Sequence, residues 1–276
     1  MVHAPMLAAG PETRLAGVWA RRPDAAAQLA AKHGSTPFED FDAFLDACEA
    51  VAFCVPPGVQ PGLAARAARK GKALLLEKPI ADSLAAAERL AAIVAESGVP
   101  AQLMLSYRYA AHVRSFLEQS RTFEAWGARG GFISGGFLAG SPFAFGWRLT
   151  RGALLDVGPH GIDLAWAALG PIVDIQAAGD LQKLVALTLR HESGALSQLQ
   201  FSAKVALPTA NVGLELFGPA GSISIDAMAN DWPAVFATIR SEFAAVVRSG
   251  RSHELDLARG VELQRLIELA EHQLGR

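Results

Sequence analysis

The sequence predicts an α/β protein with two domains: a doubly wound parallel sheet in residues 1–107, and an α+β domain with a large, mostly antiparallel open sheet in residues 108–276. Two patterns carry this prediction. Up to Tyr107, short apolar runs alternate with alanine-rich helical stretches, as in βαβ units. Beyond it, strand-like runs follow one another through short turns such as Glu192-Ser193-Gly194, as in antiparallel hairpins.

Composition narrows the class of protein. The 276 residues are 51% hydrophobic and 19% charged, enough to bury a sizeable core. The formal net charge is −2 and no basic run exceeds Arg21-Arg22, which argues against nucleic acid as a partner. No apolar segment approaches transmembrane length and no signal peptide is visible, so we expect no membrane. Cys48 and Cys54 fit a reducing compartment, and we expect a cytoplasmic protein.

Local signals define the elements of the first domain. Proline and glycine interrupt the apolar runs, as at Pro56-Pro57, Gly71 and Gly98. The expected strands are 15–20, 51–55, 74–77 and 102–107, and the expected helices are 2–9, 24–33, 41–47, 61–69 and 83–97.

One expected feature of such a sheet is missing. Its first strand is normally followed by a Gly-x-Gly-x-x-Gly turn, but none of the 26 glycines lies two positions from another, and helix 2–9 has no strand before it. Either the given chain starts late, lacking roughly a dozen residues for a strand and turn, or the fold is different. The orderly remainder favours the late start. Without this central strand, two half-sheets with exposed edges would remain.

The second domain is expected to be a strand series with helices at its ends. The expected strands are 130–137, 172–178, 184–191, 195–205, 212–217 and 222–225, and the expected helices are 110–120, 232–248 and 257–274. One further helix, between Gly152 and Gly170, interrupts the series. On it, Asp156 and His160 are four residues apart and Asp163 follows three later, so all three share one face.

That polar face belongs to an otherwise apolar helix, so it must meet water, a ligand or another polar group. A carboxylate beside an imidazole can orient it and raise its basicity. The alternative is an ordinary Asp/His pair on a solvated face.

A second candidate site lies where the apolar run Ala73–Leu76 stops at Glu77-Lys78-Pro79. Ligands of open α/β sheets bind beyond the carboxyl ends of strands, and Lys78 is one of only six lysines in the chain. The alternative is a solvated Glu-Lys pair at a strand end.

Taken in order, these motifs resemble the Gfo/Idh/MocA oxidoreductase family, and the resemblance covers essentially the whole chain. It rests on Glu77-Lys78-Pro79 and Asp156-x-x-x-His160-x-x-Asp163, supported by Val55-Pro56-Pro57-x-x-Gln60, Trp147-Arg148 and Phe217-Gly218-Pro219-Ala220-Gly221-Ser222. The resemblance implies a Rossmann domain, then a domain whose open sheet commonly makes oligomer contacts, so we expect self-association. It also implies hydride transfer between NAD(P) and a hydroxyl carbon of a sugar, cyclitol or similar alcohol.

The resemblance further implies catalytic roles for Lys78, Asp156 and His160. His160 would exchange the hydroxyl proton, Lys78 would stabilise charge on the reacting oxygen, and Asp156 would position Lys78 or the substrate. Residues expected on the cofactor side are Arg21, Arg22, Val55, Pro56, Pro57, Gln60, Glu77 and Lys78. Residues expected to bind substrate are Tyr107, Arg108, Trp147, Arg148 and Asp163.

Two alternatives stay open at these sites. Trp147 and Arg148 suit a sugar by stacking and hydrogen bonding, or they are a loop anchor and a solvated cation in a long loop. Arginines stand where an acid would bind the ribose 2′-hydroxyl of NAD, which favours NADP with NAD as second choice.

The remaining histidines show no metal spacing, so no metal is expected. An inactive cofactor-binding regulator, or a truncated homologue, is the alternative function.

Overall fold

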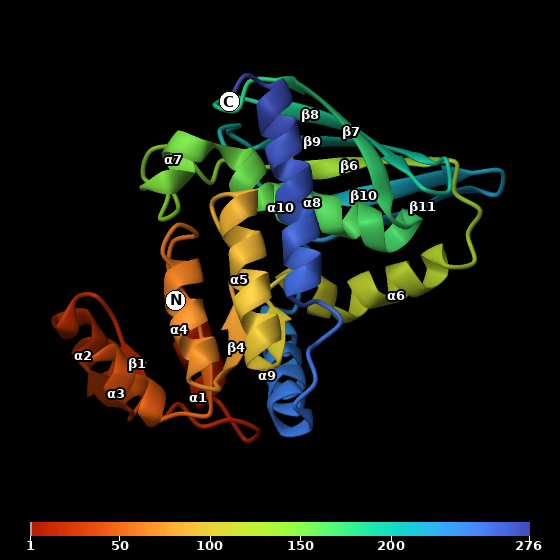
Figure 1. Cartoon of the computed structure of the whole chain (residues 1–276). Coiled ribbons are helices and arrows are strands. Elements are labelled where there is room, and N and C mark those ends of the chain that lie inside the picture. The colour runs from red at the N-terminus through yellow and green to blue at the C-terminus, as the bar shows by residue number, and fades with distance from the viewer. Residues whose placement is uncertain (1) are drawn as a thin grey trace. The chain divides into compact units, whose positions relative to one another are not determined.

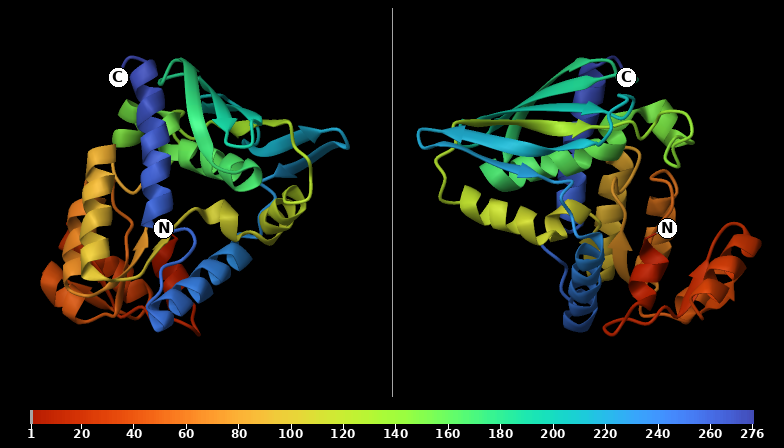
Figure 2. Two further views of the ribbon diagram at one scale, coloured as in Figure 1. Left: turned by 45° about the vertical axis from the view of Figure 1, so that its right-hand side comes forward. Right: turned by 180° about the vertical axis from the view of Figure 1, so that it is seen from behind.

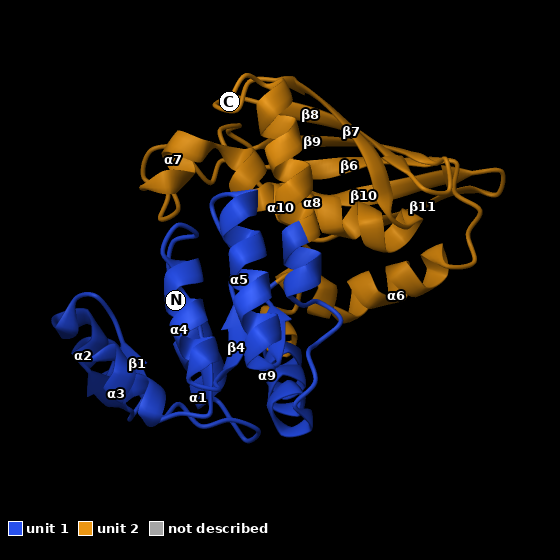
Figure 3. Cartoon of the chain, in the orientation of Figure 1, with its two compact units in different colours: residues 1–104, 236–261 blue, residues 105–235, 262–276 orange. Residues whose placement is uncertain are grey.

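The computed structural model describes residues 2–276 and divides into two compact units (Figure 3). Unit 1 comprises the described residues up to Met104 together with Phe236–Val261, and unit 2 comprises Leu105–Val235 and Glu262–Arg276. The sequence places one boundary near Tyr107 and assigns all later residues to the second domain. In the structure, Phe236–Val261 belongs to unit 1, and hydrogen bonds attach this segment to β5: Gln102 Nε2 donates to Ile239 O at 3.2 Å, and Leu103 N donates to Leu255 O at 2.7 Å.

Unit 1 alternates helices and strands along the chain (Figure 1). Its elements are α1 (His3–Ala8), β1 (Gly17–Trp19), α2 (Pro23–Lys32), β2 (Thr36–Phe38), α3 (Phe41–Asp46), β3 (Ala50–Ala52), α4 (Gln60–Arg69), β4 (Ala73–Leu76), α5 (Leu84–Ser97), β5 (Ala101–Leu103) and most of α9 (Trp232–Ser249).

The strands of unit 1 form two separate parallel sheets. One has the order β1-β2 and the other β3-β4-β5. β4 lies in the middle of its sheet and all four of its residues are buried. The two half-sheets expected for a doubly wound sheet without its central strand are therefore present, and the predicted α/β class is confirmed.

Two predicted strand ends in the first domain are wrong, and one strand was not predicted. The strand expected over 102–107 ends at Leu103, and Tyr107 lies in a 3₁₀ turn (η1, Ser106–Tyr109) held by a hydrogen bond from Arg108 N to Leu105 O. β2 escapes sequence reasoning because it has three residues with Pro37 in the middle. β3 stops at Ala52 instead of reaching Val55.

Unit 2 is built on a six-stranded sheet of order β11-β10-β6-β9-β8-β7, in which only β6 and β9 pair in parallel. Its elements are η1, α6 (Ala111–Ser120), β6 (Gly127–Ile133), α7 (Trp147–Arg151), α8 (Ala153–Leu169), β7 (Ile172–Gly179), β8 (Val185–His191), β9 (Leu196–Ser202), β10 (Asn211–Gly218), β11 (Gly221–Asp226) and most of α10 (Leu257–Gln273). The predicted open, mostly antiparallel sheet is confirmed.

Helix α8 lies along one face of this sheet (Figure 2). Gly161 makes the close approach possible, because a Cβ there would come within 2.7 Å of the Phe201 ring on β9. The close packing holds the polar residues of α8 in fixed positions relative to the sheet.

Within residues 2–276, no helix is both long enough and apolar enough to cross a membrane. Cys48 and Cys54 are both free thiols.

Candidate active site

Lys78 follows directly after the buried strand β4, in the loop Glu77-Lys78-Pro79 at its carboxyl end. Lys78 and Glu77 are half-buried, whereas Pro79 and Ile80 are buried. The run of four buried residues before the loop explains its position: β4 needs apolar neighbours on both faces, and the chain turns polar where it reaches the edge of the sheet.

Gln60, at the start of α4, holds this loop. Its side chain is fully buried, and Nε2 donates to Glu77 O at 2.8 Å and to Ile80 O at 3.1 Å. Its Oε1 accepts from Glu77 N at 2.9 Å. The amide is thus occupied by main-chain groups of the loop on either side of Lys78, so its direct effect is on the path of the backbone.

His3 is a neighbour of the loop that sequence reasoning missed. It lies in α1, 7% exposed, with Nε2 at 3.3 Å from Oε1 of Glu77. Burial lowers the pKa of His3, and this outweighs the opposing effect of the Glu77 carboxylate. A neutral imidazole therefore faces Glu77, and no sequence signal beyond membership of helix 2–9 could have found it.

The other residues expected on the cofactor side lie after the strands of unit 1. Arg21 and Arg22 are exposed after β1, and Val55-Pro56-Pro57 follows β3, with Pro57 buried. Such loops lie at the carboxyl ends of strands, where the dinucleotides of open α/β sheets bind. Residues 2–276 contain no Gly-x-Gly turn, and β1 and β3 belong to separate sheets, so the described residues do not include the usual pyrophosphate-binding turn.

In unit 2, α8 carries two buried carboxylates, each paired with an arginine. Asp156 Oδ2 accepts from Arg148 Nε at 2.9 Å, and Asp163 Oδ2 accepts from Arg108 Nη1 at 3.0 Å. The side chains of Asp156 and Asp163 are 8% and 1% exposed. The polar face expected on this helix therefore meets arginines from outside the helix, and the alternative of a solvated Asp/His face is wrong for both carboxylates.

His160 lies between these two carboxylates on α8 and is half-buried. Its ring meets that of Tyr107 edge-on, with centroids 4.9 Å apart and planes at 90°. Tyr107 also packs against Trp232 and Phe132, at 5.7 and 6.2 Å between centroids. An aromatic wall therefore limits the orientations open to the imidazole.

The hydroxyl of Tyr107 is 3.7 Å from Sδ of Met228, and burial raises the pKa of this phenol to about 12. Tyr107 is 9% exposed. Its contacts are those of a packed residue that supports His160, and its phenol stays protonated at neutral pH.

Trp147 and Arg148 begin the short helix α7, where sequence reasoning expected a loop. The Arg148 guanidinium lies over the rings of Trp147 and Phe145, at 4.8 and 5.3 Å from their centroids, while it binds Asp156. Arg148 is thus held by a carboxylate and two aromatic faces, and the alternative of a solvated Arg148 is wrong.

The structure gathers the predicted residues into two groups, one in each unit. Unit 1 brings together Gln60, Glu77 and Lys78, and unit 2 brings together Tyr107, Arg108, Arg148, Asp156, His160 and Asp163. No group of three or more His, Cys, Asp or Glu side chains suited to a metal ion occurs between residues 2 and 276.

The chain thus combines a unit of parallel strands, with polar loops at their carboxyl ends, and a unit whose open sheet packs against a helix that carries Asp156, His160 and Asp163. The sequence matches two profiles of one family: "Oxidoreductase family, NAD-binding Rossmann fold" over residues 1–105, and "GFO/IDH/MocA C-terminal domain" over residues 133–224. Together they span most of the chain, which belongs to the Gfo/Idh/MocA family.

Curated relatives act on sugars. One is a dTDP-3,4-didehydro-2,6-dideoxy-alpha-D-glucose 3-reductase of Actinomadura kijaniata, 30% identical over 195 residues, which are 68% of this chain and 55% of the relative. Another is a glucose-6-phosphate 3-dehydrogenase of Bacillus subtilis (strain 168), 28% identical over 173 residues, which are 59% of this chain and 49% of the relative. The chain thus spans about half the length of these two relatives.

Solved structures share the fold. The structure of GenD2 from gentamicin A biosynthesis, in complex with NAD, is similar to this chain with a TM-score of 0.87 and 23% sequence identity. The similarity covers 100% of this chain and 91% of the GenD2 chain. The structure of scyllo-inositol dehydrogenase from Lactobacillus casei, with bound NAD(H) and scyllo-inositol, is similar with a TM-score of 0.85 and 18% sequence identity. This similarity covers 99% of this chain and 92% of the dehydrogenase chain.

Proposed function

We propose that this chain is an NAD(P)-linked oxidoreductase that interconverts a secondary alcohol and a ketone on a sugar or cyclitol. The observation that carries the proposal is α8, where His160 lies against an aromatic wall between two arginine-bound carboxylates. The named relatives, a sugar 3-reductase and a glucose-6-phosphate 3-dehydrogenase, support the substrate class.

His160 is the proton-exchanging group in this proposal. A bound nicotinamide would accept or donate the hydride, and the protein would handle the hydroxyl proton. An imidazole can take up or release a proton near neutral pH, and the edge of Tyr107 keeps its ring in one orientation. His160 therefore accepts the proton during oxidation of the alcohol and returns it during reduction of the ketone.

Lys78 is proposed to donate a hydrogen bond to the reacting oxygen and to stabilise negative charge there. Gln60 contributes by setting the path of the loop on either side of Lys78. Asp156 contributes by holding Arg148, whose guanidinium, flanked by Trp147, is suited to hydrogen-bond a sugar hydroxyl. Asp163 and Arg108, which are both proposed to bind substrate, form an ion pair with each other.

NADP is the proposed cofactor, with NAD second. Arg21 and Arg22 are exposed after β1, where guanidinium groups suit a ribose 2′-phosphate. Self-association is also proposed, with the open face of the six-stranded sheet as the contact, and light scattering after size exclusion would measure it.

The test of this function is turnover of a sugar and cyclitol panel, followed by NAD(P)H absorbance. We expect Lys78→Ala and His160→Ala each to lower turnover by about 10² to 10⁴-fold, with an unchanged melting temperature. His272→Ala, an exposed histidine, is the matched control. Near wild-type turnover in either variant would remove the assignment. Cofactor binding without turnover of any substrate would instead favour the regulator.

A further inference from the structure

Two exposed phenylalanines lie in the connection that leads from β6 through α7 to α8 in unit 2 (Figure 1). Phe143 and Phe145 are 56% and 54% exposed, whereas Phe137, earlier in the same connection, is 6% exposed. Leu149 of α7 is also exposed. Exposed apolar side chains that cluster in this way mark places where a ligand or a partner binds.

Backbone hydrogen bonds hold the start of this connection to the sheet. Ser134 N donates to Ser202 O at 2.8 Å, and Phe137 N donates to Ala203 O at 2.7 Å. Both acceptors lie at the end of β9. The chain therefore enters the segment with the two phenylalanines from a fixed position.

A buried ion pair holds the other end. Arg151 Nη2, at the end of α7, donates to both carboxylate oxygens of Glu271, at 3.1 and 2.8 Å, and the two side chains are 15% and 5% exposed. Gln182 Nε2 also donates to Thr150 O at 3.1 Å. A helix of five residues is too short to be stable by itself, so these contacts set the position of α7.

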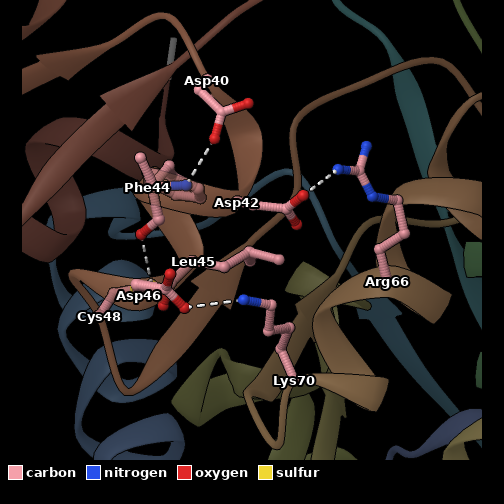
Figure 4. A network of polar contacts seen from close by, with 9 residues as sticks. Asp40, Asp42, Phe44, Leu45, Asp46, Cys48, Arg66 and Lys70 are labelled. Carbon is pink, nitrogen blue, oxygen red and sulfur yellow. Dashed lines mark hydrogen bonds and ion pairs between the residues drawn. The ribbon is translucent and has the colours of Figure 1, made fainter.

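The ion pairs between α3 and α4 of unit 1 are different in kind. Arg66 binds Asp42 and Lys70 binds Asp46, each at 3.0 Å (Figure 4). All four of these side chains are at least 42% exposed, and exposed ion pairs contribute little to stability. The shelter of the pair in unit 2 is what makes it an anchor for α7.

Arg148 links the exposed rings to the candidate active site. Its guanidinium lies over the rings of Phe145 and Trp147, while its Nε donates to Asp156 at 2.9 Å. Asp156 is one helical turn from His160 on α8. A sugar that is hydrogen-bonded to Arg148, with its reacting carbon at His160, therefore brings a substituent and not the reacting carbon to Phe145.

We propose that Phe143 and Phe145 form a subsite for a planar aromatic group attached to the sugar substrate. The inference rests on the proposed function for the position of the sugar, and it narrows the substrate class to sugars that carry such a group. Phenyl faces stack on planar aromatic rings. The Arg148 guanidinium holds the Phe145 ring in place, which lowers the entropy lost when a ligand stacks on it.

This planar group has two possible sources, the base of a nucleotide-linked sugar and an uncharged aryl aglycone. Lys204 distinguishes them. Its Nζ donates to Gln182 Oε1 at 3.0 Å, and Gln182 in turn binds the backbone of α7. The partner of the ammonium group in this contact is a neutral amide, so the ammonium suits a phosphate and has no role toward an uncharged aglycone.

The test compares the Kd values of three probes, measured by isothermal titration calorimetry on the whole chain: para-nitrophenyl glucoside, uridine diphosphate glucose and methyl glucoside. We expect at least one aromatic probe to bind about tenfold more tightly than methyl glucoside, as expected for one ring stacked on an aromatic side chain. Replacing both Phe143 and Phe145 with serine should abolish this preference. Trp126→Ser, which removes a ring that is 64% exposed elsewhere in unit 2, is the matched control and should keep it.

Two further variants sharpen the result. Glu271→Gln weakens the anchor of α7 and should reduce the preference for the aromatic probe, whereas Asp46→Asn, at an exposed ion pair of unit 1, should not. Lys204→Gln should weaken uridine diphosphate glucose alone if the planar group is a base. Tighter binding of para-nitrophenyl glucoside alone, with no effect of Lys204→Gln, would identify an aryl aglycone.

The proposal is overturned if the aromatic probes bind no more tightly than methyl glucoside, or if no probe binds. It is also overturned if sedimentation shows a dimer that the double serine variant dissociates, because a second copy of the chain then covers the two rings. Failure of the proposed function is separate: the aromatic probes would bind through Phe143 and Phe145, and no sugar or cyclitol would be turned over.

Discussion

Gln60 binds Glu77 through both backbone groups of that residue. The side-chain Nε2 donates to the Glu77 carbonyl at 2.8 Å, and the side-chain Oε1 accepts from the Glu77 N–H at 2.9 Å. The Gln60 amide thus pairs with the backbone N–H and C=O of Glu77, the residue directly after β4, as the backbone of a neighbouring strand would. Lys78 therefore leaves the sheet from a backbone that α4 holds in place.

Replacing Gln60 with alanine should destabilise unit 1 by about 1–3 kcal/mol, because the fully buried side chain of Gln60 loses its hydrogen bonds to the backbone of Glu77. Urea unfolding followed by circular dichroism measures this free energy. Gln119→Ala is the control, since Gln119 is exposed on α6 and its side-chain amide donates a long hydrogen bond to Ser115, and it should change stability by less than about 0.5 kcal/mol. Equal effects of the two substitutions would show that the loop does not depend on Gln60.

Tyr107 should tolerate phenylalanine and not alanine. The ring packs against His160, Phe132 and Trp232, whereas the only contact of the hydroxyl within residues 2–276 is a long one of 3.7 Å with Met228 Sδ. Tyr107→Phe should cost less than about 1 kcal/mol, and Tyr107→Ala about 3–5 kcal/mol. Thermal unfolding distinguishes the two, and nitrogen chemical shifts of His160 should move in the alanine variant alone. A direct substrate contact by the hydroxyl would instead appear as lost turnover in Tyr107→Phe.

The buried pair of Arg108 and Asp163 should show strong coupling. Asp163→Ala leaves a guanidinium whose side chain is 13% exposed without this carboxylate, and should cost about 3–5 kcal/mol. Removing both partners should cost less than the sum of the single substitutions, because no uncompensated charge remains. A double-mutant cycle from urea titrations measures the difference. Strict additivity would mean that the two charges do not stabilise one another.

Stability should fall as the pH drops from about 7.5 to 5.5. Burial lowers the pKa values of His3 and His191 below the ordinary 6.5, so the unfolded chain binds protons that the folded chain excludes. Their contribution is complete above pH 6.5 and is lost as the pH falls toward the folded-state values. For His191, burial outweighs the hydrogen bond from Nδ1 to Gly170 O at 2.8 Å, which by itself raises the pKa; Nε2 lies 2.6 Å from Ser197 Oγ.

Urea midpoints at three pH values test this dependence. His191→Gln should flatten the profile, while His272→Gln, at an exposed position, should keep the wild-type slope. A profile equally steep in His191→Gln would exclude this histidine as a source of the pH dependence.

Much of the fold could be predicted from the sequence because its signals are local. Proline and glycine bound the apolar runs, and Ser83 caps α5 as expected of a helix that starts there. Glu77-Lys78-Pro79 marks a strand end, and four-residue spacing puts Asp156 and His160 on one helix face. Three-residue strands carry no comparable signal, which is why β2 and the end of β3 were missed or misplaced.

The partners of the site residues could not be predicted, because they come from distant parts of the chain. Arg108 is 55 residues from Asp163, and His3 is far in sequence from Glu77. Spacing shows that a carboxylate lies on a helix face, but only tertiary structure shows which cation meets it. The pairing of Asp156 with Arg148 likewise depends on the short helix α7, whose sequence resembles a loop.

Unit 1 is discontinuous in the chain, and this has a consequence for biosynthesis. Its last segment, residues 236–261, is made only after the 131 residues from Leu105 to Val235. At about 5–20 residues per second, the ribosome needs roughly 7–26 s to bridge this interval. During that time Gln102 and Leu103 lack Ile239 and Leu255, and Glu12 lacks the Arg240 guanidinium that lies 2.8 Å away in the folded unit. The parallel-sheet unit, although first in sequence, is therefore completed only after residues 105–235 of unit 2 have been made.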